Sequence, residues 1–174
     1  MAAGGSIKQT YWLLAVSQEE MPPTTAVVIS ALNTVFNSLN SFLCIYSLTS
    51  VARGESFHED GFSSLPLTIG GTMYLTGIFL EAFSEIQRTH FKQDPNNKGK
   101  PFTGGLFSLA GHINYGGITL WRAGYAMAAA GWPWAAAVGG FFFYDFASRG
   151  VPVLDAYCQE MVCWRSVRCM TSFN

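Results

Sequence analysis

Long uncharged stretches dominate the sequence, and four of them stand out between charged or turn-forming segments. The first covers residues 24–48 and contains no charged residue. The second covers residues 65–83 and is uncharged until Glu81. The third and fourth lie within residues 113–147 and are divided by the sequence "GWPW" at 131–134. Because about 20 apolar residues cross a bilayer as a helix, the pattern predicts an all-α, polytopic membrane bundle with about four transmembrane segments.

The first stretch carries three amide side chains at a helical spacing. Asn33, Asn37 and Asn40 are separated by four and three residues, so they share one face of a helix. Hydrogen bonds between neighbouring helices are one explanation, since such contacts are routine in membrane bundles. The other explanation is that this face lines a substrate or cofactor cavity. The sequence leaves both interpretations open.

The second stretch ends in a run of ionic residues. Glu81, Glu85, Arg88 and Lys92 fall on one side of a continued helix. A charge inside a membrane span costs about 2.5–3.5 kcal/mol on insertion scales, so charges at this position need a reason. They form either ion pairs on a solvated helix end or the inward-facing rim of a cofactor site.

The last two stretches each contain one charged residue that lies among apolar residues in the sequence. Arg122 lies in "TLWRAGY" and Asp145 in "FFFYDFA". Each can extend to the membrane interface, as long polar side chains do near helix ends. Alternatively, the two residues can pair with each other across a helical hairpin. Pro133 fits the first turn of the second helix of this hairpin.

Composition and charge agree with a membrane protein and exclude several functions. Hydrophobic residues make up 49% of the 174 residues and charged residues only 12%, about half the usual share. A formal net charge of −1 argues against a nucleic-acid partner. The three histidines show no metal-ligand spacing, so no metal site is predicted. The basic connector at residues 84–102 predicts a cytosolic side for that segment.

Three blocks of sequence carry a family resemblance. They are "EAFSEIQR", "TGGLFSLAGHINYGGITLWRAGYA" and "FFFYDFASRGVPVLDAY". Together they resemble the steroid 5-alpha-reductase family in its broader membrane form, which includes DUF1295-type fungal proteins. The resemblance implies a multi-pass endoplasmic-reticulum membrane domain over residues 1–157, incomplete at its end, followed by a divergent tail over 158–174. It also implies NADPH-dependent reduction of a carbon–carbon double bond in a steroid, sterol or other lipid.

The resemblance also implies site residues. The positions that match the family's NADPH contacts are Glu81, Glu85, Lys92, Asn114, Arg149 and Tyr157. In "SQEEMP", Glu20 matches a catalytic carboxyl that polarises the substrate carbonyl. Hydride delivery to an enone builds negative charge on the carbonyl oxygen, and a proton donor in a dry pocket stabilises that charge. The implied partners are therefore a lipid or sterol-like small molecule and the bilayer.

Two other functions remain open at this stage. An S-adenosylmethionine-dependent lipid or isoprenylcysteine methyltransferase shares the membrane architecture, although "GHINY" lacks the proline of its His-Pro block. The sequence "RGVPVLDAY" also lacks the paired glutamates of that group. The other possibility is that the chain is a catalytically degenerate membrane protein. It is suggested by Gly111, where relatives often have a basic residue, and by the tail after Tyr157.

Overall fold

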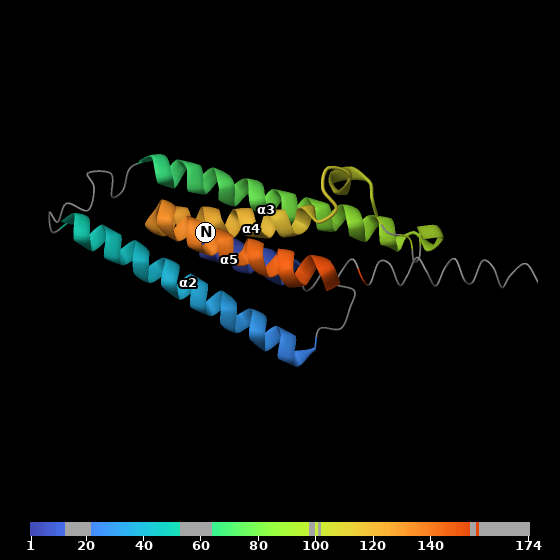
Figure 1. The fold of residues 1–174 in the computed structure, drawn as a ribbon, viewed down its shortest axis with the longest axis horizontal. Coiled ribbons are helices and arrows are strands. Elements are labelled where there is room, and N and C mark those ends of the chain that lie inside the picture. The colour runs from blue at the N-terminus through green and yellow to red at the C-terminus, as the bar shows by residue number, and fades with distance from the viewer. Residues whose placement is uncertain (13–21, 53–63, 98–99, 101, 154–155, 157–174) are drawn as a thin grey trace, which may run out of the picture.

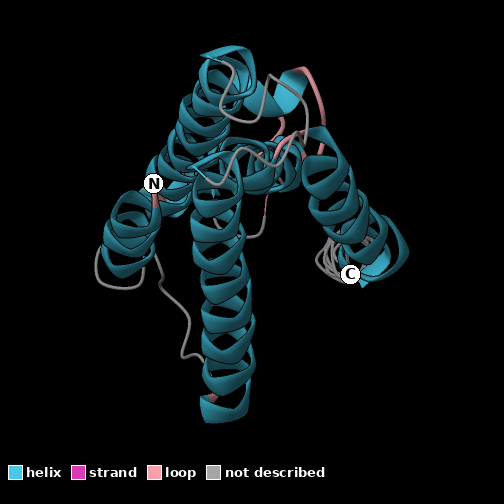
Figure 2. Cartoon of the chain, turned by 90° about the vertical axis from the view of Figure 1, so that its left-hand side faces the viewer, coloured by secondary structure: helices cyan, strands magenta, loops and turns pink. Residues whose placement is uncertain are grey.

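The computed structural model describes residues 1–12, 22–52, 64–97, 100, 102–153 and 156 (Figure 1). Its elements, in chain order, are α1(Ala2–Tyr11), α2(Pro23–Ala52), α3(Ser64–Gln93), η2(Pro95–Asn97), η3(Gly105–Ser108), α4(Ile113–Ala130), α5(Trp132–Asp145) and η4(Phe146–Gly150). The last of these is a π-helical turn that continues α5. The described ranges contain helices and loops and no strand (Figure 2), so the all-α prediction is confirmed.

Helices α3 and α4 pack through glycines at which their backbones nearly touch. A Cβ atom on Gly77 would lie 2.4 Å from the backbone nitrogen of Trp121, and one on Gly117 would lie 2.9 Å from the Gly77 carbonyl oxygen. At a second contact, between Gly70, seven residues before Gly77, and Gly124, seven residues after Gly117, a Cβ on Gly124 would lie 2.6 Å from the Gly70 carbonyl oxygen. Small residues permit this close approach in membrane bundles, and here they fix how the two helices face each other.

Helices α4 and α5 form the hairpin that the "GWPW" sequence predicts. Gly131 connects them with a φ of 78°, a left-handed conformation that glycine adopts without strain. Helix α5 begins at Trp132, and Pro133 stands in its first turn as predicted. The small apolar core of the bundle lies between these helices and α2, and it contains Ala126, Val138 and Phe142 packed against Phe36.

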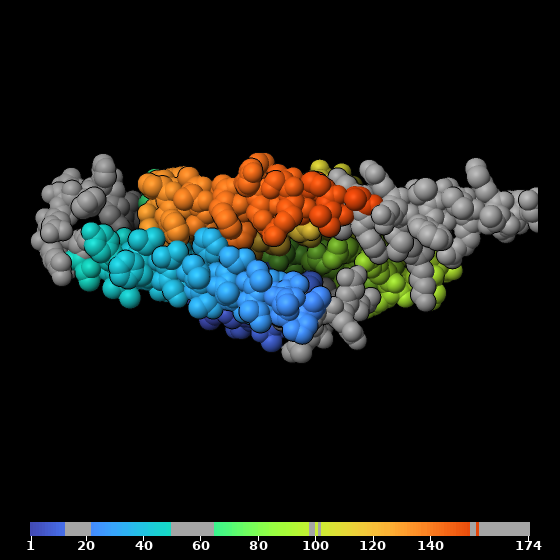
Figure 3. All heavy atoms as spheres, turned by 60° about the horizontal axis from the view of Figure 1, so that its bottom comes forward, coloured from blue at the N-terminus to red at the C-terminus, as the bar shows by residue number. Residues whose placement is uncertain are grey.

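Helix α2 has an inverted pattern of burial. Asn40 is the one buried side chain between Pro23 and Thr49, whereas most of the large apolar side chains are exposed. These exposed residues include Val27, Val28, Val35, Phe42 and Ile45. Figure 3 shows α2 lying along α5, with the side of α2 that faces the viewer uncovered. An apolar helix that turns its amides inward and its aliphatic groups outward is typical of a lipid-facing helix.

The number of membrane spans is only partly supported. All four predicted segments are helical. Among the described residues, however, only the Pro23–Thr49 part of α2 is both long and apolar enough to cross a bilayer. Membrane association through α2 is therefore supported, and four spans remain a prediction.

The asparagine face of α2 mainly joins helices. The Trp134 Nε1 group of α5 donates a hydrogen bond to Asn40 Oδ1 at 2.6 Å. The Arg122 Nη2 group of α4 donates to Asn33 Oδ1 at 2.5 Å, and Asn33 Nδ2 in turn donates to Gln9 of α1. Asn33 and Asn37 both line a small cavity of about 40 Å³. The first interpretation is thus confirmed for Asn33 and Asn40, while a substrate- or cofactor-lining role of this face stays a prediction.

Arg122 does not pair with Asp145, so that alternative was wrong. Its guanidinium carbon lies 4.6 Å from the ring centre of Trp121 and 4.4 Å from that of Phe142. Asp145 instead forms an ion pair with Arg149, one turn further along the chain. The arginine is held inside the bundle because two aromatic rings and an amide replace its water shell.

Candidate functional site

A docked loop fixes the start of α4. Gly105 has a φ of 56°, which places the following peptide against the Gln87 side chain of α3. The Leu106 backbone N–H then donates a hydrogen bond to Gln87 Oε1 at 3.0 Å. Phe102 packs on Phe91 with ring centres 4.9 Å apart. These contacts hold the glycine-rich loop on α3 and so determine where the first turn of α4 lies.

A buried carboxylate lies beneath that first turn. Glu85 of α3 accepts a hydrogen bond from Asn114 Nδ2 at 2.9 Å and pairs with Arg88 Nη2 at 2.6 Å. Both Glu85 and Asn114 are buried. The Asn114 Oδ1 atom is also buried and has no hydrogen-bond partner among the described residues. A buried acceptor left in this state is available to an N–H or O–H group of a ligand.

A second carboxylate lies one turn earlier on α3. Glu81 forms an ion pair with Lys8 of α1, and Glu81 Oε2 accepts a hydrogen bond from Trp121 Nε1 at 2.7 Å. A cavity of about 20 Å³ lies beside this pair, and Glu81, Glu85 and Lys8 are among its lining residues. The two carboxylates therefore belong to one polar cluster between α1, α3 and α4.

A much larger apolar cavity lies on another face of α4. Its volume is about 540 Å³. The residues that line it are Met73, His112, Tyr115, Gly116, Thr119, Leu120, Ala123, Phe143, Phe146, Ala147 and Val151. Three of these rings are stacked in order: His112 and Tyr115 have centres 5.9 Å apart, and Tyr115 and Phe146 have centres 4.6 Å apart.

The polar cluster and the apolar cavity meet at the first turn of α4. Asn114 belongs to the cluster and its neighbour Tyr115 to the cavity. Successive residues of a helix point about 100° apart, so one turn serves both sides. This turn is the best candidate for a site at which a polar cofactor and an apolar substrate come together.

The structure brings together three of the residues predicted to bind a cofactor. Glu81, Glu85 and Asn114 line or complete the polar cluster. Lys92 is exposed near the end of α3, about 10 Å along the helix from Glu85. Arg149 lies in η4, and its side chain is 75% exposed and paired with Asp145.

The other two predicted residues cannot be placed. Glu20, the predicted catalytic carboxyl, and Tyr157, a predicted cofactor contact, lie outside the described residues. Gly111 can be placed, and a Cβ atom there would meet nothing within 4 Å. The absence of a side chain at this position therefore leaves open space beside His112.

Three residues of the site were missed in the sequence. Lys8 is far from Glu81 in the chain and belongs to no motif. Gln87 follows the ionic residues of α3, yet its role depends on a loop 19 residues later. Trp121 was a visible signal in "LWRAGY", but an indole in an apolar stretch is ordinarily a packing residue.

Comparison with known proteins identifies the family. A family model described as "Protein of unknown function (DUF1295)" matches residues 16–167. This chain belongs to the DUF1295 family. The resemblance stated from the sequence is thus confirmed at the level of DUF1295. The DUF1295 match covers the polar cluster apart from Lys8, and it covers the whole apolar cavity.

One curated relative is similar over most of the chain. The chain is 39% identical over 155 residues to "Probable O-methyltransferase ustE" of Ustilaginoidea virens. The match covers 89% of this DUF1295 chain and 54% of that protein, so the chain spans about half the length of this relative. No solved structure matches.

Proposed function

We propose that this chain is the membrane-associated part of an O-methyltransferase that acts on an apolar small molecule. The similarity to a relative named as a probable O-methyltransferase supports this class of reaction. The observation that carries the proposal is the presence in the polar cluster of two carboxylates, Glu81 and Glu85, which are largely shielded from solvent and are each paired with one cation.

The residues of the cluster suit S-adenosylmethionine as the methyl donor. That molecule has a positive sulfonium, an amino group and ribose hydroxyls, all of which interact favourably with carboxylate and amide oxygens. The acceptors in question are Glu81, Glu85 and the unpaired Oδ1 of Asn114. When bound, S-adenosylmethionine supplies an electrophilic methyl group.

NADPH suits the same residues less well. Its phosphate groups carry several negative charges, which the carboxylates of Glu81 and Glu85 would repel. The two cations in the cluster, Lys8 and Arg88, are each already paired with one of these carboxylates. A reductase would therefore need phosphate-binding cations outside the cluster.

The apolar cavity suits the methyl acceptor. A volume of about 540 Å³ lies within the usual range for small-molecule pockets of roughly 300–1,000 Å³. Aromatic and aliphatic side chains make up most of its wall. His112 and Tyr115 are its titratable residues, and a neutral His112 imidazole would accept the proton that the acceptor's hydroxyl loses on methylation.

The bilayer is the natural source of such an acceptor. The exposed apolar side chains of α2 support membrane association, and an apolar substrate concentrates in the same phase. The endoplasmic reticulum, as implied by the steroid-reductase resemblance, is the membrane we propose. Fractionation of tagged protein with organelle markers tests that location.

Reduction of a lipid double bond with NADPH is the second candidate. One observation favours it: Glu85 and Asn114, which the resemblance assigns to the same nucleotide, are hydrogen-bonded to each other. That contact places the two residues at one site, as the reductase resemblance implies.

A ligand-binding experiment separates the candidates. Detergent-solubilised protein is heated with S-adenosylmethionine, with NADPH, or with neither. A ligand that binds only the native state stabilises it by about 2.7 kcal/mol at 100 times its Kd. We expect stabilisation by S-adenosylmethionine alone. Stabilisation by NADPH alone would overturn the methyltransferase in favour of the reductase, and no response to either ligand would favour a degenerate protein.

A further inference from the structure

The Lys8 ammonium group lies against two groups that typically bind organic cations. It forms an ion pair with the Glu81 carboxylate and lies 5.1 Å from the ring centre of Trp121. Carboxylates and aromatic faces are the recurrent elements of sites for sulfonium and quaternary ammonium ligands. We infer that Glu81 and Trp121 form a binding site for an organic cation, and that Lys8 occupies this site in the absence of a ligand.

Helix α1 is held in place mainly by polar contacts. Tyr74 donates a hydrogen bond to the Met1 carbonyl at 2.6 Å, and Asn33 donates to Gln9 at 2.9 Å. No residue of α1 is buried. Both contacts are part-buried, and a neutral hydrogen bond of this kind contributes only about 0.5–1.5 kcal/mol, because water replaces the partner when the bond breaks. Moving Lys8 away from Glu81 therefore requires no disruption of the apolar core.

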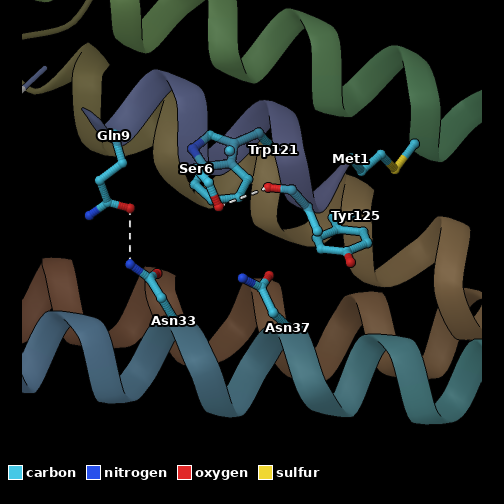
Figure 4. Close-up of a pocket in the computed structure, with 9 residues that line it drawn as sticks. Met1, Ser6, Gln9, Asn33, Asn37, Trp121 and Tyr125 are labelled. Carbon is cyan, nitrogen blue, oxygen red and sulfur yellow. Dashed lines mark hydrogen bonds between the residues drawn. The ribbon is translucent and has the colours of Figure 1, made fainter. Parts of the chain in front are cut away.

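Two small cavities are lined in part by residues of α1. The cavity of about 20 Å³ includes Lys8, Glu81 and Glu85 in its lining. The other has a volume of about 40 Å³, and Figure 4 shows Asn33 and Asn37 of α2 pointing into it towards α1 and α4. Each holds at most a few water molecules.

Displacing α1 opens both cavities into a single groove. The floor of that groove contains a carboxylate pair on α3, amides on α2, and Trp121 and Tyr125 on α4. A nucleoside-sized ligand needs all of this space, because neither cavity alone can hold it. Helix α1 thus acts as a cover whose lysine stands in for the positive charge of the ligand.

The ligand we assign, which rests on the proposed function, is the sulfonium group of S-adenosylmethionine. Its positive charge is surrounded by methyl and methylene groups, which suit the Trp121 face. Arg122 also lies against Trp121, but Asn33 and Phe142 hold it in place. The charge that the ligand replaces is therefore that of Lys8.

A small probe cation tests the site without any methyl donor. In the Lys8→Ala variant, trimethylsulfonium should raise the unfolding temperature more than it does in the unchanged protein. The neutral molecule tert-butanol should not, and adding Glu81→Gln should abolish the effect. Lys100→Ala, at an exposed residue outside the cluster, is the matched control. Lys8→Gln serves as a second variant in case Lys8→Ala folds poorly.

Equal shifts in the Lys8→Ala variant and the unchanged protein would overturn the cation site. A shift that persists in the Lys8→Ala/Glu81→Gln double variant would overturn it as well. A purely structural ion pair predicts one of these two results, because a freed carboxylate on its own does not select a methylated cation.

A second measurement tests the assigned ligand. S-adenosylhomocysteine has the same adenosyl and amino-acid parts as S-adenosylmethionine but a neutral sulfur. Lys8→Ala should tighten binding of S-adenosylmethionine about tenfold, the effect of roughly 1.4 kcal/mol, and leave S-adenosylhomocysteine unchanged. Glu81→Gln should weaken the binding of S-adenosylmethionine and leave that of S-adenosylhomocysteine unchanged.

Negative results in the two measurements overturn different claims. If neither adenosyl compound binds, the proposed function fails, and the trimethylsulfonium result still decides the cation site. Suppose that both compounds bind and that the ratio of their dissociation constants is the same in all variants. The methyl donor is then bound elsewhere, and the assignment of its sulfonium to Glu81 and Trp121 is wrong.

Discussion

Asn114 donates a hydrogen bond at 2.9 Å to the buried carboxylate of Glu85, and this contact joins the first turn of α4 to α3. The two residues are 29 positions apart in the chain. The bond leaves the Asn114 Oδ1 atom directed away from the carboxylate and without a partner among the described residues. The amide thus uses its donor for the fold and keeps its acceptor for a ligand.

Asn114→Ala should abolish stabilisation by the methyl donor. The variant removes the free acceptor and also leaves Glu85 with one partner fewer, which should lower the free energy of unfolding by about 1–3 kcal/mol. Thermal unfolding with and without S-adenosylmethionine measures both effects. Asn96→Ala, at an exposed residue of η2, is the control and should change neither. A full ligand response in Asn114→Ala would remove this residue from the site.

Gly77→Ala should strongly destabilise the α3–α4 pair. The added Cβ would lie 2.4 Å from the Trp121 backbone nitrogen, so the helices must separate. We expect a loss of about 1–3 kcal/mol, typical of overpacking. Gly140→Ala is the matched control, because a Cβ there meets nothing within 4 Å and alanine favours a helix. Denaturant unfolding in detergent compares the two, and equal stabilities would contradict the close packing.

Asn33→Ala should destabilise the protein more than Asn37→Ala. Asn33 accepts a hydrogen bond from Arg122, and its loss leaves a buried guanidinium short of a partner. Hydrogen bonds to charged groups contribute about 1.5–3 kcal/mol, so we expect a loss of that order. Asn37 lines the same small cavity as Asn33 but bonds to no charged group within the part of the chain that the structure describes. Thermal unfolding of the two variants, made on the same helix face, measures the difference, and the reverse order would be evidence against the arginine–amide contact.

Gly116→Leu should block the apolar cavity without destabilising the fold. Gly116 lines the cavity, and a Cβ there would meet nothing within 4 Å. The leucine side chain should therefore occupy space that the methyl acceptor needs. With a lipophilic phenol as acceptor, we expect a KM at least about tenfold higher, which corresponds to 1.4 kcal/mol of lost binding. Gly140→Leu, outside the cavity, should leave the KM unchanged. An unchanged KM in Gly116→Leu would place the acceptor elsewhere.

Local patterns predicted the helices but not their partners. The spacing of Asn33, Asn37 and Asn40 was enough to place them on one face, and "GWPW" was enough to begin a helix at Trp132. Periodicity reports which residues share a face and says nothing about what that face meets. Periodicity therefore could not predict that Arg122 bonds to Asn33 and not to Asp145.

For the same reason, the sequence predicted only part of the candidate site. Glu85 and Asn114 were both selected through a family resemblance, which did not predict that they are hydrogen-bonded to each other. The pairing of Lys8 with Glu81 joins residues 73 positions apart and follows from the placement of α1. No spacing rule links such residues, because the contact exists only after the helices have packed.

The glycine contacts between α3 and α4 have a consequence for the site that lies beyond them. Gly124 is ten residues from Asn114, about 15 Å along the helix. Because backbone meets backbone at Gly70 and at Gly77, α4 cannot turn about its own axis without a collision. The glycines therefore block rotation of α4 against α3, which keeps Asn114 directed at Glu85 and Tyr115 at the cavity when the rest of the bundle shifts.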